Sequence, residues 1–528
     1  MSSAIASWSA RLGLAAGLAL AACAPALAQH LRLGVSSPIT SIDPHFQNLV
    51  PNIAVSNHIF EQLMSMDAEG RLQPGLAESL TQIDDTTWEA RLRRGVKFHD
   101  GSDFTAEDVV WSLERPATVV RSPAPFTIYT RAIERVAIVD PHTLRVTTRG
   151  PYPLLAGDLA QVFVMSRRAA QNATTEDLNR GVGAVGTGPY RFVRYVADDR
   201  VELERNADHW RGRPAWERVT IRFIANDASR LAGLLANDLD AIDQIGTADI
   251  AAVRANPNLV FEQKPSFRII YFYVDQGRDQ TPFVTARDGS PLPRNPLKDP
   301  RVRQAISMAI SRQAIRDNIM EGTSLPSSQF ILPVMYDGDT IPQTAFDPAA
   351  ARRLLTEAGY PDGFAMTIHG PNNRFVNDGK IVEAVAQMLT RIGILARVDT
   401  MPMASYAGRG ARGEFSFGLI GWGAQTGEIS TTLRSIIACE NRERGMGPFN
   451  WSRYCNARVD ELTQQALATS DQRRRNAILR EAGKLAAAEG AIIPIHFQST
   501  TWAARRGIAI EGRADERTLA MSFRPPTN

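Results

Sequence analysis

The sequence has little cysteine and little lysine. Three cysteines among 528 residues exclude a fold held together by several disulfides. Only five of the 59 basic residues are lysines, the arginines are spread along the chain among carboxylates, and the net charge is +3. Nucleic-acid-binding surfaces concentrate their basic residues, so we predict no nucleic-acid partner.

The short motifs of several common enzyme classes are also missing. The sequence has no HExxH, GxSxG or Walker A motif, and no two of its eight histidines stand four residues apart. These absences argue against a zinc centre, a serine-hydrolase elbow and a phosphate-binding loop. We therefore predict no catalytic activity, no cofactor and no bound metal. An exported hydrolase stays an alternative, because the members of a catalytic triad need not be close in sequence.

One apolar run stands near the N-terminus, and we find no run elsewhere that is long enough to span a bilayer. Leu12–Ala22 follows the single charged residue Arg11 and precedes the small-x-small sequence Ala26–Ala28. This layout predicts a secretory signal peptide over residues 1–28, since the run is shorter than the ~20 residues that cross a membrane. Leu20–Cys23 also resembles a lipobox, so either cleavage follows Ala28 or Cys23 carries a lipid anchor. Both outcomes place the protein in the periplasm.

Two cysteines remain once Cys23 is removed or lipidated. An even pair in an oxidising compartment predicts a disulfide between Cys439 and Cys455. Closing a loop of about 16 residues stabilises the fold by roughly 3 kcal/mol in the chain-entropy model. A metal site is the alternative for paired cysteines, but no nearby histidine or second cysteine pair completes a tetrahedral set.

The composition and local patterns predict a large α/β protein. Apolar residues make up 44% and charged residues 22%, as in globular proteins of two or more domains. Residues 92–115 are predicted as a strand, a turn and a helix, with Thr105 and Asp108 forming a capping box. Residues 52–66 are predicted as a helix, and strands alternate with helices between residues 301 and 420. Strands are also predicted at 491–497 and 501–510.

Several sequence blocks, taken in order, resemble the family 5 extracellular solute-binding proteins of bacteria, which bind dipeptides, oligopeptides, glutathione or nickel. The dipeptide-binding members are the most similar in pattern, and they too carry a cysteine pair at these places, which supports the disulfide. The blocks are Ile59–Asp67, Leu92–Arg115, Gly186–Tyr195, His209–Asn226, Leu297–Ile315, Phe346–Gly359, Gly421–Leu433 and Ile492–Ala504.

The resemblance implies a two-lobe α/β fold of the periplasmic binding-protein type, with an additional subdomain in lobe I. We expect lobe I over residues 29–275, with the inserted subdomain at about 70–185. Lobe II is expected over 276–497, and residues 498–528 are expected to return to lobe I.

The resemblance also implies a function. The chain is expected to be the solute-binding component of an ABC-type importer, capturing a short peptide or another carboxylate-bearing small molecule between its lobes. Its expected partners are that ligand and an inner-membrane permease with its ATPase subunits, and we expect a monomer. A nickel- or metal-chelate-binding protein of the same family is the alternative.

The resemblance also implies which residues bind the ligand. Arg374 matches the region whose arginine pairs with a dipeptide carboxylate in the relatives. Aligned on Trp422, Gln425 stands where peptide-binding relatives have an aspartate for the ligand ammonium, and a neutral amide cannot replace that charge-assisted bond. Glu428 is the nearest acidic substitute. The remaining candidates are Gly423 and Ala424 beside Trp422, and Thr40, Ser41 and Gln244 in lobe I.

Overall fold

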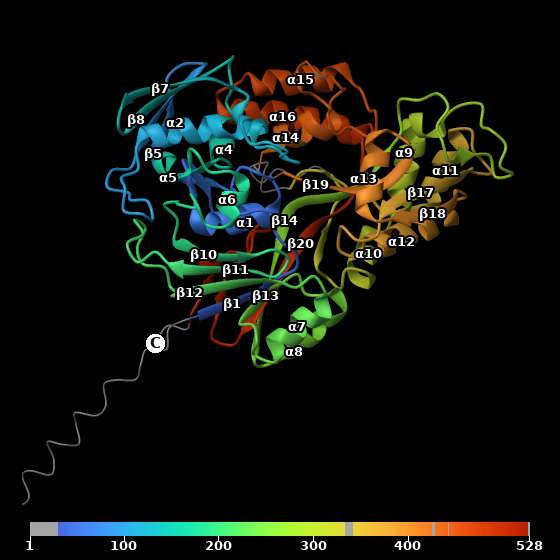
Figure 1. Cartoon of the computed structure of the whole chain (residues 1–528). Helices are drawn as coiled ribbons and strands as arrows, with labels where there is room; N and C mark the ends of the chain where they lie inside the picture. Colours follow the sequence, from blue (N-terminus) through green and yellow to red (C-terminus); the bar gives the residue numbers. More distant parts are fainter. Residues whose placement is uncertain (1–29, 333–341, 425–427, 442, 526–528) are drawn as a thin grey trace, which may run out of the picture.

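The computed structural model describes residues 30–332, 342–424, 428–441 and 443–525. The predicted signal peptide, Cys23 and Gln425 lie outside these ranges. The architecture is mixed α/β around one curled sheet of twelve strands (Figure 1). Its main strand order is β10 (Tyr190–Val196), β11 (Arg200–Arg205), β12 (Arg218–Phe223), β1 (His30–Val35), β13 (Ala241–Asp243), β20 (Ile493–Arg505), β14 (Leu259–Val274), β19 (Phe417–Gly423), β17 (Ala365–Pro371) and β15 (Val284–Thr285), with β16 (Ser324–Pro326) paired to β20 and β18 (Leu395–Met401) paired to β17.

The two longest strands join the two parts of the molecule. β14 has 16 residues and β20 has 13, and they pair antiparallel from Leu259–Arg505 to Phe272–Ile493. The register shifts between Pro265 and Ile269, where proline has no N–H to give to the ladder. β13 continues the sheet from β20 into lobe I, and β19 continues it from β14 into lobe II. The strands predicted separately at 491–497 and 501–510 are therefore mainly one crossing strand.

Lobe I contains its own core and a second, four-stranded sheet. That sheet has the order β5 (Ala77–Gln82), β6 (Thr87–Leu92), β8 (Thr143–Thr148) and β7 (Ile133–Asp140), and it lies within the expected insertion at 70–185. The predicted capping box is confirmed, because Thr105 and Asp108 cap α2 (Ala106–Glu114). The core also contains Trp502, Ala504 and Phe523 from the C-terminal segment. These residues of the C-terminal segment pack in this core, and the lobe boundaries, including the return of residues 498–528 to lobe I, stay a prediction.

Lobe II has helices on both faces of its sheet. Successive residues of β14 alternate between two cores: Ile270 and Phe272 belong to one, and Tyr271 and Tyr273 to the other, as the two-residue period of a strand requires. The first core includes α9 (Pro300–Ala309), α11 (Pro348–Glu357) and α12 (Asp378–Arg391), and the second includes α13 (Met403–Ala411), α15 (Ala457–Leu467) and α16 (Gln472–Ala488). β17 runs parallel to β18 and β19, as the α/β pattern predicts.

The prediction of a helix over residues 52–66 is wrong in its second half. Helix α1 (Val50–Ile59) ends before Phe60, whose backbone is extended. The carbonyl of Ile59 accepts the N–H of Gly188, and β2 (Glu61–Gln62) pairs with β9 (Phe163–Val164). Tertiary contacts therefore stop a helix that local propensity would continue.

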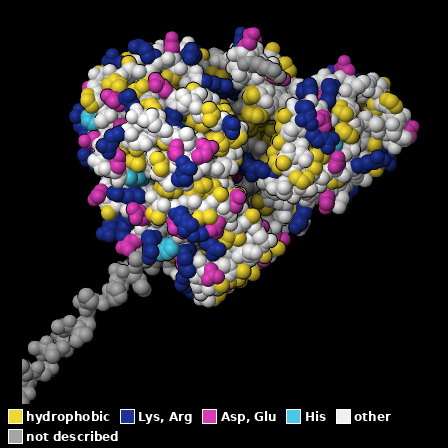
Figure 2. Space-filling model, viewed as in Figure 1, with side chains coloured by type: hydrophobic (Ala, Val, Ile, Leu, Met, Phe, Trp, Pro, Cys, Tyr) yellow, Lys and Arg dark blue, Asp and Glu magenta, His cyan; other side chains and the backbone are white. Residues whose placement is uncertain are grey.

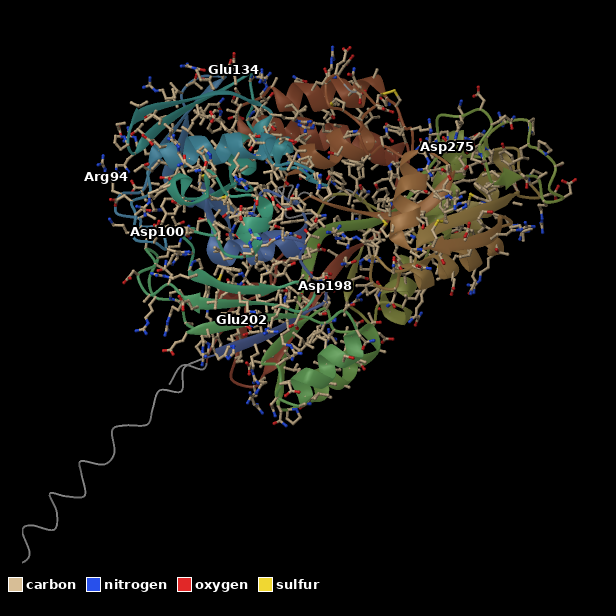
Figure 3. The ribbon with its side chains drawn as sticks, viewed as in Figure 1. Arg94, Asp100, Glu134, Asp198, Glu202 and Asp275 are labelled. Carbon is tan, nitrogen blue, oxygen red and sulfur yellow. A yellow bond between two sulfur atoms is a disulfide. The ribbon has the colours of Figure 1, made fainter. Side chains whose placement is uncertain are left out.

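Charged residues lie over the outer surface of both lobes. Figure 3 shows Glu202 on β11, Asp198 in the turn between β10 and β11, and Asp275 in lobe II just beyond the end of β14. Asp275 is buried and accepts a hydrogen bond from Arg278 Nε at 2.5 Å, which anchors the exit from the crossing strand.

The remaining elements are short connections and surface helices. In the part of the chain that the structure describes, no helix is both long and apolar enough to cross a membrane. The short strands and α-helices not named above are β3 (Met64–Met66), β4 (Leu72–Pro74), α3 (Thr127–Thr130), α4 (Leu155–Leu159), α5 (Arg167–Ala170), α6 (Thr175–Asn179), α7 (Asp227–Leu235), α8 (Ile250–Ala255), α10 (Arg312–Asn318), α14 (Ile429–Thr432), β21 (Ala509–Ile510) and β22 (Phe523–Arg524).

Candidate functional site

A cavity of about 750 Å³ lies between the lobes where β14 and β20 cross, and Figure 2 shows the surface hollowed between the larger and the smaller part of the molecule. Its walls are the loop after β1, the start of α1, the stretch after β13 and the turn between β17 and α12. The end of β12 with the stretch that follows it, β14, β20 and the C-terminal segment supply the remaining lining. The lining residues used below are Ser36, Asp227, Asp243, Gln244, Thr247, Arg268, Arg374, Asn377, Gln498, Glu516 and Thr518.

Three lining residues have a left-handed backbone although none is glycine. The φ angles are +48° at Gln244, +54° at Asn377 and +64° at Glu516. Such conformations are uncommon for residues with a side chain, and they cluster at ligand-binding and active sites. The three residues come from different segments, the stretch after β13, the turn before α12 and the C-terminal segment, so left-handed backbone occurs in three parts of the cavity lining.

An ion pair forms part of the cavity wall. Arg268 of β14 binds Glu516 through Nε at 3.0 and 3.1 Å and through Nη2 at 2.7 Å, and both side chains are 9% exposed. Ser266 Oγ donates to the same carboxylate at 2.8 Å. Burial alone would raise the pKa of Glu516, but the Arg268 guanidinium outweighs it and holds that pKa below its ordinary value. The Glu516 carboxylate is therefore ionised, and both of its oxygens already accept hydrogen bonds within the protein.

Arg374 brings a second guanidinium to the cavity. Its backbone N–H donates to Asp378 Oδ2 at 2.9 Å, which fixes the turn before α12. The side chain packs over the ring of Phe375, 5.3 Å from its centre. Arg374 keeps an exposed surface; partial desolvation by its surroundings lowers its pKa, and repulsion from Arg268 adds to this. Among the described residues no carboxylate forms an ion pair with this guanidinium, so it can bind an anion from outside.

The lobe I wall carries two carboxylates held by internal partners. Asp243 accepts the backbone N–H of Ser36 at 2.8 Å and the hydroxyl of Thr518 at 3.0 Å. Asp227 accepts a bond from the buried Arg230 at 2.7 Å. Burial raises the pKa of Asp243. These carboxylates organise the wall and leave Arg374 as the side chain best placed to bind a charged ligand.

Of the three candidate ligand-binding residues in lobe I, one lines the cavity and two do not. Gln244 lines the cavity together with Arg374. Ser41 donates to Asn179 at 2.9 Å, and Thr40 donates to Gln47. Thr40 and Ser41 are not among the lining residues, and their role in binding stays a prediction.

Trp422, Gly423 and Ala424 lie next to the cavity, and none of these three described residues is part of its lining. Trp422 pairs with Ile269 and packs on Phe449 with ring centres 5.6 Å apart, whereas Gly423 pairs with Arg268. Adjacent strand residues point to opposite faces, so Trp422 faces the core of α13, α15 and α16. Ala424 is buried, and its N–H donates to Phe267 O at 3.3 Å.

Glu428 is engaged within lobe II. Its carboxylate accepts from Arg475 Nε at 3.2 Å and from the hydroxyl of Ser430. Burial raises the pKa of Glu428 despite these partners. Binding a ligand ammonium here would require this carboxylate to leave Arg475, so its role as a substitute acid stays a prediction.

Comparisons with known proteins identify the family. The profile of the bacterial extracellular solute-binding proteins, family 5 Middle, matches residues 71–443. The chain belongs to this family. The glutathione-binding protein GsiB of Salmonella choleraesuis (strain SC-B67) is 30% identical over 497 residues, which cover 92% of each chain.

Solved structures confirm the two-lobe fold of family 5. HbpA2 from Haemophilus parasuis matches with a TM-score of 0.78 at 21% identity, covering 94% of this chain and 100% of that one. A dipeptide-binding protein from Pseudoalteromonas sp. SM9913 in complex with Met-Leu matches with a TM-score of 0.75 at 22% identity, covering 94% and 100%. At these identities the structures establish the fold alone.

Four further residues line this family 5 cavity, and the sequence analysis did not single out any of them. Arg268, Glu516, Asn377 and Gln498 all line it, yet none belongs to a short motif. Their positions depend on how the crossing strands and the C-terminal segment pair, which no local pattern reveals. The left-handed backbone of Asn377 and Glu516 has no clear sequence signature either.

The predicted disulfide is present between Cys439 and Cys455. With Asp460 these cysteines form the one group of potential metal ligands found among the described residues. Sulfurs bonded to each other offer no thiolate to a metal, and Asp460 accepts the N–H of Cys439 at 3.1 Å. This arrangement fits the disulfide rather than the metal alternative.

Proposed function

We propose that this chain is the solute-binding component of an ABC-type importer and that it captures a short peptide or peptide-like carboxylate between its lobes. The observation that carries the proposal is the Arg374 guanidinium, which faces the interlobe cavity without a carboxylate partner among the described residues. A planar guanidinium matches a carboxylate in bidentate geometry. Dipeptides and glutathione, the ligands named for the relatives above, both end in carboxylates.

The cavity chemistry favours this ligand class over a metal chelate. No histidine is among the described residues that line the cavity, whereas imidazole is a common ligand of nickel and other transition metals. The described lining therefore offers no imidazole ligand to a metal ion.

The proposal includes the place and partners of the protein. It works in the periplasm as a monomer without enzymatic activity, after removal of residues 1–28 or lipid attachment at Cys23. Lobe closure around the ligand presents a changed surface to an inner-membrane permease and its ATPase subunits, as in hinge closure around other captured ligands.

Calorimetry of Arg374→Ala tests the proposal. Dipeptides and glutathione are titrated into the wild type, into Arg374→Ala and into Arg352→Ala, which removes an exposed arginine on α11. A charge-assisted hydrogen bond contributes about 1.5–3 kcal/mol, so Arg374→Ala should lose roughly 10- to 150-fold in affinity and Arg352→Ala nothing.

Ligand amides provide the complementary control. An amidated dipeptide should bind the wild type weakly and should be insensitive to Arg374→Ala, because it has no carboxylate to lose. Equal affinity of the wild type and Arg374→Ala for the free acid would contradict the assignment of Arg374. Absence of binding by any short peptide or small carboxylate would contradict the proposed function itself.

A further inference from the structure

The subdomain of lobe I that contains the four-stranded sheet meets lobe II outside the ligand cavity. Gln82, at the end of β5, donates through Nε2 to the hydroxyl of Ser470 in the turn before α16 at 3.1 Å. A Cβ atom on Gly445 would lie 3.4 Å from Arg131 Nη2, so the segment between the two cysteines also touches the subdomain. Figure 1 shows α14 and α16 beside α4 at this contact. None of these four residues is part of the cavity lining.

Asp158 of α4 is buried at this contact. The residue is 7% exposed, and Tyr152 donates a hydrogen bond to its Oδ2 at 2.6 Å. Arg434 and Glu428 of lobe II both act on its carboxyl group electrostatically, as does Arg131 of lobe I. Burial raises the pKa of Asp158 to about 7, because the desolvation of the carboxylate outweighs the two guanidinium groups. The protonation of this carboxyl group therefore depends on both lobes.

The other groups at this contact are less ready to change charge. The charged and titratable groups that face Asp158 are Tyr129, Arg131 and Tyr152 of lobe I and Glu428 and Arg434 of lobe II. Burial raises the pKa of both tyrosines, so they stay neutral, and the arginines stay charged. Burial also raises the pKa of Glu428, but Arg475 binds its carboxylate at 3.2 Å. Asp158 has the hydroxyl of Tyr152 as its partner instead of an arginine, and this arrangement favours its neutral form.

Parting the lobes would remove part of the burial of Asp158. Arg434, Glu428 and the atoms around them would withdraw, and water would reach the carboxyl group. Because burial disfavours the ionised form, the pKa of Asp158 would then fall towards its ordinary value of about 3.9. Between that value and about 7 the closed form keeps a proton that the open form releases. A ligand that binds the closed form is therefore bound more tightly at the acidic side of this range.

We propose that Asp158 links the closure of the lobes to the uptake of a proton. Closing brings lobe II over the protonated carboxyl group, and opening lets this group ionise. Asp158 then controls ligand affinity without touching the ligand, since it is not part of the cavity lining. The inference rests on the proposed function, because it takes the ligand to be held by the closed lobes.

Calorimetry across a range of pH tests this link. Met-Leu is titrated at pH 5.5, 6.5 and 7.5 into the wild type, into Asp158→Asn and into Asp208→Asn, which alters an exposed carboxylate of lobe I. Asparagine has nearly the shape of the protonated acid and cannot ionise. The affinity of the wild type and of Asp208→Asn should fall roughly ten-fold over this range through the uptake of one proton. Asp158→Asn should keep the affinity that the wild type has at pH 5.5.

Two further measurements examine the contribution of lobe II and the proton itself. The positive charge of Arg434 favours the ionised form of Asp158, so the decline in affinity should move to higher pH in Arg434→Gln. Wild-type titrations near pH 6 in buffers of different ionisation enthalpy count the protons, and about one should be taken up per ligand bound. The proton count needs no variant, so it decides the question even if Asp158→Asn does not fold.

Three results would overturn the inference and leave the proposed function standing. The first is the same pH dependence of affinity in Asp158→Asn and in the wild type. The second is ligand binding by the wild type without proton uptake, because Asp158 would then be equally buried in the open and closed forms. The third is an unchanged pH profile in Arg434→Gln, which would confine the titration to lobe I. Absence of binding by any short peptide or small carboxylate at every pH would overturn the proposed function and this inference with it.

Discussion

The ion pair between Arg268 and Glu516 allows one prediction to be worked through from the structure. Glu516→Gln removes the negative charge and leaves a buried guanidinium beside a second one at Arg374. Both side chains of the pair are 9% exposed and share three contacts of 2.7–3.1 Å. Breaking a buried pair by removing one partner typically destabilises a protein by about 3–5 kcal/mol, and we expect that range here.

Removing both charges should be much less harmful than removing one. The double substitution Arg268→Met with Glu516→Leu leaves no uncompensated charge, and apolar replacements of buried pairs are often neutral. Glu511→Gln is the matched control, because Glu511 lies in the same segment but is 50% exposed and its nearest contact with Arg524 is 3.5 Å. An exposed pair of this kind contributes about 0–1 kcal/mol.

The pair also predicts a pH dependence. The folded pKa of Glu516 is below its ordinary value, so the folded state binds the proton less tightly than the unfolded state does. This stabilisation is complete above the ordinary pKa of about 4.3 and is lost as the pH falls through the lower folded value. In Glu516→Gln this part of the acid dependence should disappear.

Urea unfolding followed by circular dichroism measures both effects. The midpoints of the wild type, Glu516→Gln, Glu511→Gln and the double variant are compared at pH 7, and the first two again between pH 3 and 5. A Glu516→Gln midpoint equal to that of Glu511→Gln would refute the reasoning. A double variant as unstable as the single one would show that the cost does not come from an unpaired charge.

Two further predictions concern Asp158 and Asn377. Burial raises the pKa of Asp158 to about 7, although Tyr152 donates a hydrogen bond to its carboxylate at 2.6 Å. In this pH range the folded state therefore keeps a proton that the unfolded state releases. The free energy of unfolding should fall as the pH rises from about 4 to about 7. Asp158→Asn should flatten this decline in melting temperatures measured across pH 4–8, and an unchanged slope would count against the assignment. Asn377 Nδ2 donates across the lobes to Thr247 at 2.9 Å and within lobe II to Ile319 O at 2.7 Å. Asn377→Gly, which tolerates the same φ, should therefore weaken Met-Leu binding about five-fold through loss of the one bond that crosses the lobes. Calorimetry beside Asn372→Gly, which alters an exposed residue of the same turn that does not line the cavity, measures the change, and equal affinities would exclude a bond that favours the closed lobes.

Features set by local sequence were predicted well. The capping box of Thr105 and Asp108 follows from side chains three residues apart, and the pairing of Cys439 with Cys455 follows from the cysteine count and compartment. Arg374 was predicted to bind the ligand from family resemblance; it lines the cavity, and its role in binding stays a prediction.

Features set by pairing over long distances were not predicted. Glu516 meets Arg268 across 248 residues, and Gln498 bonds Ser266 across 232. Their positions depend on the register of β14 against β20 and on the return of the C-terminal segment. Local periodicity carries no information on either. The helix predicted beyond Ile59 failed for the same reason, because Gly188 and β9 decide where that chain turns.

The pairing of the C-terminal half of β20 determines when lobe I can complete its core during synthesis. β13 pairs with Ala503 and Ala504, and Trp502 and Phe523 lie in the same core as Leu31 and Leu33. The lobe that is synthesised first therefore cannot finish its core until almost the last residues leave the ribosome. This late closure leaves the core of lobe I incomplete during most of synthesis. It also means that a fragment ending before β20 would expose the edge of β13 and should aggregate rather than fold.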